Sequence, residues 1–128
     1  NIFALYGMGD SQRGMKNHEG SIACWLKILE KEPQNQNLHS RVGDALVILG
    51  KLDDAMDHYR KSLKVNYDMF ALLGMARVHR LKKEYGEAEK CLLQILEKNK
   101  DEERTLAELI HLYDETGEDA KARAIRAR

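Results

Sequence analysis

The chain has 128 residues, of which 43% are hydrophobic and 33% charged, with one proline and nine glycines, a profile that excludes a disordered or fibrous protein. The 21 basic residues equal the 21 acidic ones, so no net charge attracts nucleic acid, and no apolar run reaches the ~18 residues that a membrane helix needs. We therefore expect one folded domain over residues 1–128, cytoplasmic by default, with no nucleic acid or membrane partner.

The two ends of the chain indicate a fragment of a longer protein. The first residue is Asn1 rather than methionine, and no basic and apolar leader pattern follows it. The last stretch, Lys121–Arg128, ends on a helical pattern without a stop signal.

Segments of the sequence recur at an offset of 67 residues, which is the main signal in the chain. Residues 3–13 and 70–80 share six of eleven positions, and residues 25–32 and 92–99 share five of eight. Two series divide this offset into steps of 34, 33 and 34: Ser21, Ala55, Ala88, Ala122 and Gly9, Gly43, Ala76, Ile110. The chain is therefore predicted to contain repeats at about 2–35, 36–68 and 69–102, with a truncated repeat at 103–128.

Each repeat reads as two helices joined by a turn. In the second repeat, apolar residues at helical spacing run from Leu38 to Leu49, stop at Gly50, and resume from Leu52. Glycine permits the left-handed conformation in which helices often end, and Gly117 is expected to do the same in the fourth repeat.

Small and large residues alternate in a way that predicts close helix packing. The recurring small residues let neighbouring helices approach, and bulky residues such as Trp25, Tyr59 and Leu92 then fill the space between them. Phe70, Tyr85 and the five methionines are interpreted as further core residues.

The same positions carry a resemblance to the tetratricopeptide repeat family, whose unit has the pattern W-x2-L-G-x2-Y, then A-x3-F, then P. Val42-Gly43 and Ala55-x3-Tyr59 match this pattern in the second repeat, and Ser21-x3-Trp25 with Pro33 matches it in the first. The resemblance implies an all-α fold, a right-handed α-solenoid of antiparallel helix-turn-helix units. It also implies a protein-interaction scaffold whose concave groove holds a protein or peptide.

Nothing in the spacing of reactive residues indicates an enzyme, a metal site or a cofactor site. The five histidines are scattered over the repeats without metal-ligand spacing: His18, His39, His58, His79 and His111. Cys24 and Cys91 occupy equivalent places two repeats apart, too far for a disulfide, and are predicted to be free thiols.

The resemblance implies that groove positions lie on the first helix of each repeat. The candidate partner-binding residues are Tyr6, Asp10, Arg13, Asn37, Arg41, Asp44, Phe70, Arg77, Arg80 and His111. Arginine suits bidentate contact with carboxylates, so the partner is predicted to carry acidic groups. Equally open is the alternative that these arginines pair internally with Asp10 and Asp44.

Two other functions compete with this hypothesis. The helix at Ala122–Arg128 lacks a polar cap, so its apolar side could stack on a second copy in a self-assembling structural protein. RNA binding is opposed by the balanced charge. The family's chaperone-binding clamp uses lysines and asparagines at places that Tyr6, Asp10 and Asp44 occupy here, so a chaperone tail is not expected.

Overall fold

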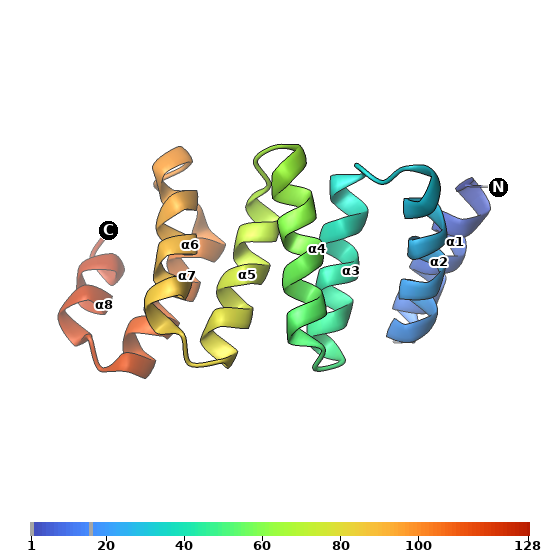
Figure 1. The fold of residues 1–128 in the computed structure, drawn as a ribbon. Helices are drawn as coiled ribbons and strands as arrows, with labels where there is room; N and C mark the ends of the chain where they lie inside the picture. The colour runs from blue at the N-terminus through green and yellow to red at the C-terminus, as the bar shows by residue number, and fades with distance from the viewer. Residues whose placement is uncertain (1, 16) are drawn as a thin grey trace. The chain divides into compact units, whose positions relative to one another are not determined.

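The computed structural model describes residues 2–15 and 17–128, apart from the side chains of residues 2–5 and 14. These residues form helices and turns and no strand, which confirms the all-α class (Figure 1). The helices of the described part are α1 (Ile2–Gly14), α2 (His18–Lys31), α3 (Gln36–Ile48), α4 (Leu52–Val65), α5 (Met69–Leu81), α6 (Tyr85–Lys98), α7 (Glu103–Thr116) and α8 (Asp119–Arg126). Each of the four predicted repeat ranges contains one pair of helices.

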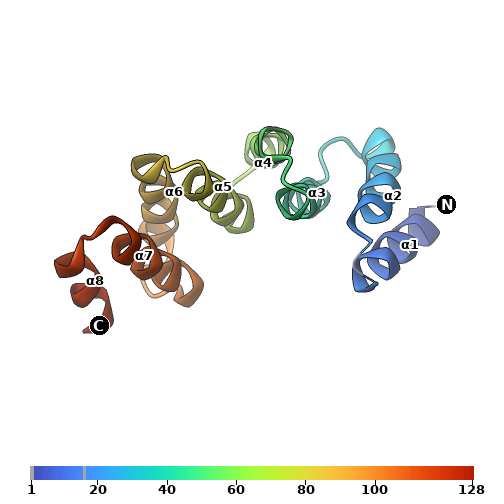
Figure 2. The same cartoon turned by 90° about the horizontal axis from the view of Figure 1, so that it is seen from below.

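The chain folds as two compact units, Asn1–Gly74 and Met75–Arg128. In the first unit, α2 packs against α1 and α3, and α3 packs against α4. Figure 2 looks along α3 and α4 and shows this pair side by side. In the second unit, α7 packs against α6 and α8.

Capping side chains begin several of the helices and recur with the repeat. Asn35 accepts from the Leu38 N–H at 3.1 Å before α3, and Glu102 accepts from the Thr105 N–H at 2.7 Å before α7. Between them, Asp68 accepts from the Phe70 N–H at 3.0 Å at the start of α5. These three residues are spaced by 33 and 34 positions, the period of the packing residues.

Glycines terminate two helices at the positions that the sequence predicted. Gly50, beyond the end of α3, has φ 79°, and Gly117 has φ 77° and caps α7. A residue with a side chain adopts this left-handed region only at a cost, which glycine avoids.

The predicted pairing of small with bulky residues is confirmed in the first unit. Trp25 is 1% exposed and packs over Gly9, while Tyr59 is fully buried between Gly43 and Gly74. A Cβ added at Gly43 would lie 2.6 Å from the Tyr59 ring, and one at Gly74 would be closer still. Only glycine therefore allows these helices their present separation.

The prediction of a buried position is wrong for three other residues. Phe70 is 51% exposed, Met8 54% and Met15 67%. Helical spacing identifies residues that share a face of a helix, but it does not tell whether another helix covers that face.

Both cysteines are buried free thiols. Burial, with a smaller effect of the nearby Glu87 carboxylate, raises the pKa of Cys91 to about 11. The thiolate is the reactive form, so this cysteine acts as an inert packing residue.

Two of the scattered histidines, His39 and His58, meet between α3 and α4. Their Nδ1 atoms lie 3.1 Å apart, and Nε2 of His39 lies 2.7 Å from the Pro33 carbonyl oxygen. Because a carbonyl only accepts, His39 carries its hydrogen on Nε2, and the Nδ1–H of His58 donates to His39. Burial first, then the Lys61 and His39 charges, lower the pKa of His58 to about 4.

Because the pKa of His58 is lowered, we expect acid to reduce the stability of the fold. His58 in the unfolded chain takes up a proton near pH 6.5, whereas the folded chain keeps it neutral down to about pH 4. The contribution of neutral His58 is thus complete above pH 6.5 and is lost as the pH falls through 4. Because His58 is only half buried, solvent screens part of this effect, and we expect the free energy of unfolding to drop by about 1 kcal/mol between pH 7.5 and 5. Urea titrations of the wild type and His58→Gln measure this drop, and equal drops would contradict the assignment to His58.

A candidate partner-binding hollow

An open hollow of about 540 Å³ lies in the first unit, formed by α1, α3, the segment that joins α4 to α5, and the start of α5. It contains five of the ten predicted groove residues. The lining residues are Arg13, Gln36, Asn37, Ser40, Arg41, Asp44, Tyr67, Asp68 and Phe70.

Two arginines on neighbouring repeats share one carboxylate beside this hollow. Arg41 Nη1 lies 2.9 Å from Asp10 Oδ1, and Arg13 Nη2 lies 3.9 Å from the same oxygen. Both guanidinium carbons are 6.0 Å from the centre of the Trp25 ring. The predicted internal pairing with Asp10 is therefore confirmed for Arg13 and Arg41. A guanidinium has five N–H donors, so a shared carboxylate leaves donors for a second acceptor.

The carboxylates that line the hollow are held by hydroxyl groups of the same unit. The Tyr59 hydroxyl donates to Asp44 at 2.6 Å. Asp68 accepts from the Ser40 hydroxyl at 2.5 Å and from the Ser62 hydroxyl at 2.6 Å. Asp68 thus joins α3, α4 and the start of α5, and it fixes the wall of the hollow.

Apolar side chains stand at the rim. Phe70 is 51% exposed and Tyr67 is 39% exposed, and both line the hollow. A smaller adjoining hollow of about 130 Å³ shares Arg13, Arg41 and Asp44 and adds Ile48, which is 63% exposed. Exposed aromatic and aliphatic groups next to arginines are the combination enriched at protein interfaces.

The other predicted groove residues do not line this hollow. Tyr6 accepts a hydrogen bond of 2.6 Å from the Asn35 side chain, next to the cap of α3. In the second unit, Arg77 lies 3.9 Å from Glu108, Nε of Arg80 is buried with no hydrogen-bond partner in the described structure, and His111 is exposed on α7. Their role in partner binding stays a prediction.

Sequence reasoning did not single out Tyr67, Asp68 or Gln36 for the site. Gln36 donates to the carbonyl oxygens of Ser62 and Asn66 at 2.9 and 2.7 Å, so it ties α3 to the end of α4. The recurrence of capping residues at Asn35, Asp68 and Glu102 is the signal that could have identified Asp68.

No three histidine, cysteine, aspartate or glutamate residues gather as a metal site within residues 2–15 and 17–128. In the same described ranges, none of the helices has the length and apolar character required to span a bilayer.

Comparison with known proteins identifies two family models and two long relatives. The model described as tetratricopeptide repeat matches residues 3–35, and that of the coatomer epsilon subunit matches residues 40–127. Tetratricopeptide repeat protein 21B of Xenopus laevis is 27% identical over 89 residues, 70% of this chain. Tetratricopeptide repeat protein 21A of Mus musculus is 27% identical over 92 residues, 72% of this chain. The chain spans 7% of the length of each relative.

Solved structures share the fold at low sequence identity. MamA protein superimposes with a TM-score of 0.82 and 21% identity, over 97% of this chain and 68% of that one. A tetratricopeptide repeat protein from Parabacteroides merdae ATCC 43184 gives a TM-score of 0.87 and 21% identity, over 98% of this chain and 49% of that one. The first tetratricopeptide repeat domain of Spaghetti (RPAP3), bound to the HSP90 peptide SRMEEVD, superimposes with a TM-score of 0.81 and 19% identity. The match covers 91% of this chain and 95% of that one.

Proposed function

Since the chain belongs to the tetratricopeptide repeat family and, over residues 40–127, to the coatomer epsilon subunit family, we propose that it is a module for holding another protein. In this proposal it binds a segment of its partner and catalyses no reaction. The RPAP3 domain, which shares its fold, is bound to a short peptide, and this supports a peptide-sized partner segment.

The proposed binding site is the 540 Å³ hollow of the first unit. The observation that carries this assignment is the meeting of Arg13 and Arg41 with the exposed rings of Tyr67 and Phe70 on one open surface. Guanidinium groups recognise carboxylates, and the rings offer apolar contact area. The segment that fits best therefore carries an acidic side chain close to an apolar one.

The role of Asp10 makes the acidic-partner proposal testable. If Arg41 only holds Asp10, the arginine serves the fold and the partner does not contact it. If the guanidinium of Arg41 also contacts the partner, Asp10 orients that guanidinium, as a supporting residue orients a binding group. The two cases give different binding constants in variants of these residues.

We expect Arg41→Ala to weaken the binding of an acidic peptide about tenfold, the loss of one charged hydrogen bond. The peptide is first selected from a random library on the wild-type chain, and its Kd is then measured by fluorescence polarisation. Asp10→Asn is expected to retain binding, because the amide oxygen of asparagine can still accept from Arg41 and position it. Arg60→Ala is the matched control, because Arg60 is exposed on α4 and pairs only at 3.5 Å with Asp57. Equal Kd values for Arg41→Ala and Arg60→Ala would refute the arginine contact.

The double variant Arg77→Ala plus Arg80→Ala tests, in the same assay, whether the predicted groove arginines of the second unit contribute to binding. A rise in Kd would support their place in the site, and an unchanged Kd would restrict the site to the first unit. Circular dichroism of each variant distinguishes lost binding from lost folding.

A further inference from the structure

A second open hollow of the first unit, the basic hollow, lies beside the candidate partner-binding hollow. It measures about 520 Å³ and is lined by Pro33, Gln34, Lys61, Lys64 and Val65. Pro33 and Gln34 belong to the turn between α2 and α3, and the other three residues belong to the end of α4. Ligand pockets usually measure about 300–1,000 Å³, so the basic hollow has room for side chains of a bound segment.

Two lysines give the basic hollow a positive charge that the chain does not balance. None of the lining residues is acidic, and the ammonium groups of Lys61 and Lys64 form no ion pair or hydrogen bond within the described residues. Asp57, one turn before Lys61, pairs instead with Arg60 at 3.5 Å. The two lysines are three positions apart on α4, where like charges repel, and the helix dipole favours cations at this end without neutralising them. An acidic group from outside the chain would relieve the repulsion.

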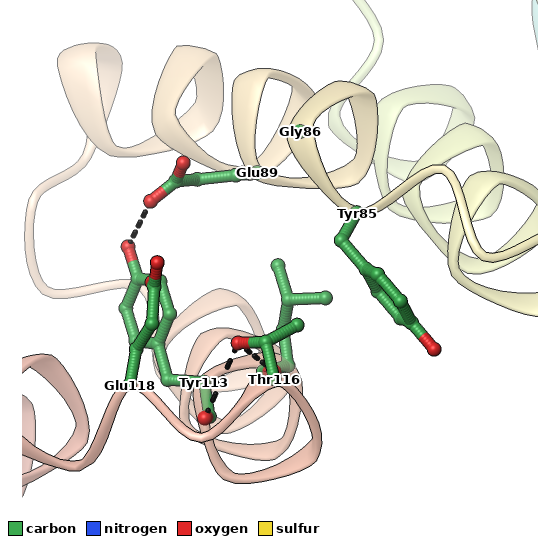
Figure 3. Close-up of a pocket in the computed structure, with 7 residues that line it drawn as sticks. Tyr85, Gly86, Glu89, Tyr113, Thr116 and Glu118 are labelled. Carbon is green, nitrogen blue, oxygen red and sulfur yellow. Dashed lines mark hydrogen bonds between the residues drawn. The ribbon is translucent and has the colours of Figure 1, made fainter.

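The charged groups around a cavity of the second unit show the opposite situation. This cavity of about 100 Å³ is lined by Glu89, Tyr113 and Glu118, among others (Figure 3). Glu89 accepts from the Tyr113 hydroxyl at 2.6 Å, and Oε2 of Glu118 lies 3.2 Å from Nζ of Lys121. Both carboxylates therefore have partners within the chain, and the cavity needs none from outside. The two lysines of the basic hollow lack such partners in the part of the chain that the structure describes.

The same two segments of the chain border both hollows of the first unit. Gln36 lines the partner-binding hollow two residues after Gln34, and Tyr67 lines it two residues after Val65. Gln36 also donates to the Ser62 carbonyl oxygen at 2.9 Å, which holds the two segments together. Residues two apart in sequence have Cα atoms within about 7 Å, a distance that an extended peptide covers with about two residues. One bound segment can therefore reach both hollows.

We propose that the partner segment of the proposed function continues past Gln36 into the basic hollow, where it places a second acidic side chain against Lys61 and Lys64. The inference rests on the proposed function, because ion pairs with exposed lysines are too weak to hold a partner alone. Val65 is 41% exposed and, with Pro33, offers apolar contact to the stem of that side chain. The partner segment thus carries two separate acidic groups, one for each hollow.

We expect Lys61→Ala plus Lys64→Ala to weaken binding of the library-selected acidic peptide about fivefold, the loss of two exposed charge contacts. Fluorescence polarisation measures the Kd. Lys27→Ala plus Lys51→Ala is the matched control, because it removes the same charge from exposed lysines of the first unit that line neither hollow. Equal Kd values for the two double variants would overturn the proposal.

Comparison with Arg41→Ala separates this inference from the proposed function. If Arg41→Ala weakens binding and the variant of Lys61 and Lys64 does not, the partner-binding hollow stands and the extension into the basic hollow is refuted. If neither weakens binding, both proposals fail.

A measurement on the wild-type chain covers the case in which a variant fails to fold. We expect the bound peptide to shift the side-chain ε-methylene signals of Lys61 and Lys64 in nuclear magnetic resonance spectra, and to leave those of Lys27 and Lys51 unchanged. Unchanged signals of Lys61 and Lys64, or equal shifts at all four lysines, would rule out a contact in the basic hollow.

Discussion

Gly74→Ala is expected to lower the free energy of unfolding of the first unit by about 3 kcal/mol or more, the upper range for overpacking. A Cβ at this position would overlap the ring of Tyr59, which is fully buried and also packs closely against Gly43. The ring cannot move away because the core around it is close-packed. Urea unfolding followed by circular dichroism measures the effect.

Gly86→Ala is the matched control, since Gly86 also lies in a helix and a Cβ there meets nothing within 4 Å. This change is expected to stabilise the chain by up to ~1 kcal/mol through helix propensity. In a Tyr59→Leu background, Gly74→Ala should cost much less, because the smaller side chain leaves room. Similar effects of Gly74→Ala and Gly86→Ala would contradict the packing model.

Asp68→Ala is expected to destabilise the first unit by about 3 kcal/mol. The change removes the acceptor of the Ser40 and Ser62 hydroxyls, both buried, and the partner of the Phe70 N–H. Leaving a buried donor unsatisfied costs about 1–3 kcal/mol, and losing a helix cap costs about 1 kcal/mol. Chemical denaturation gives the value.

Asp57→Ala is the control for Asp68→Ala. Asp57 is 63% exposed and pairs with Arg60 at 3.5 Å, so its loss should change stability by no more than about 0.5 kcal/mol. Asp68→Asn should fall between the two, because one amide oxygen can still accept from a hydroxyl. If Asp68→Ala and Asp57→Ala are equally stable, Asp68 does not join the helices as described.

The repeat could be predicted from the sequence because its physical cause is local and periodic. In the first two repeats a glycine faces a bulky residue, Gly9 facing Trp25 and Gly43 facing Tyr59, and these pairs are separated by the period of the repeat. Helix ends at Gly50 and Gly117 follow from backbone conformation alone. These features need no knowledge of how distant segments meet.

The exposure of Phe70 and the meeting of His39 with His58 could not be predicted in the same way. Both depend on which helix faces are covered, and this is decided by contacts between helices rather than by spacing within one. The candidate site was partly predictable: the family resemblance placed Arg13, Arg41 and Phe70, which do line one hollow.

The sequence left open whether the arginines pair with Asp10 or contact a partner, and the structure was needed to show that Arg13 and Arg41, the latter 31 residues from Asp10, share its carboxylate. The capping role of Asp68 could have been found earlier, since Asn35, Asp68 and Glu102 keep the period of the repeat. Acidic and amide residues at repeat boundaries are therefore worth aligning together with the small residues.

Mapping a library-selected acidic peptide onto the chain through its amide chemical shifts tests whether the hollow of the first unit holds a partner segment. We expect shifts at Ser40, Arg41, Asp44 and Phe70, which line the hollow, and none at Asp57 and Arg60, which are exposed on α4 and do not line it. Shifts confined to α4, or a selected peptide that leaves the amide shifts of the four hollow residues unchanged, would contradict the assignment of the partner site to the hollow.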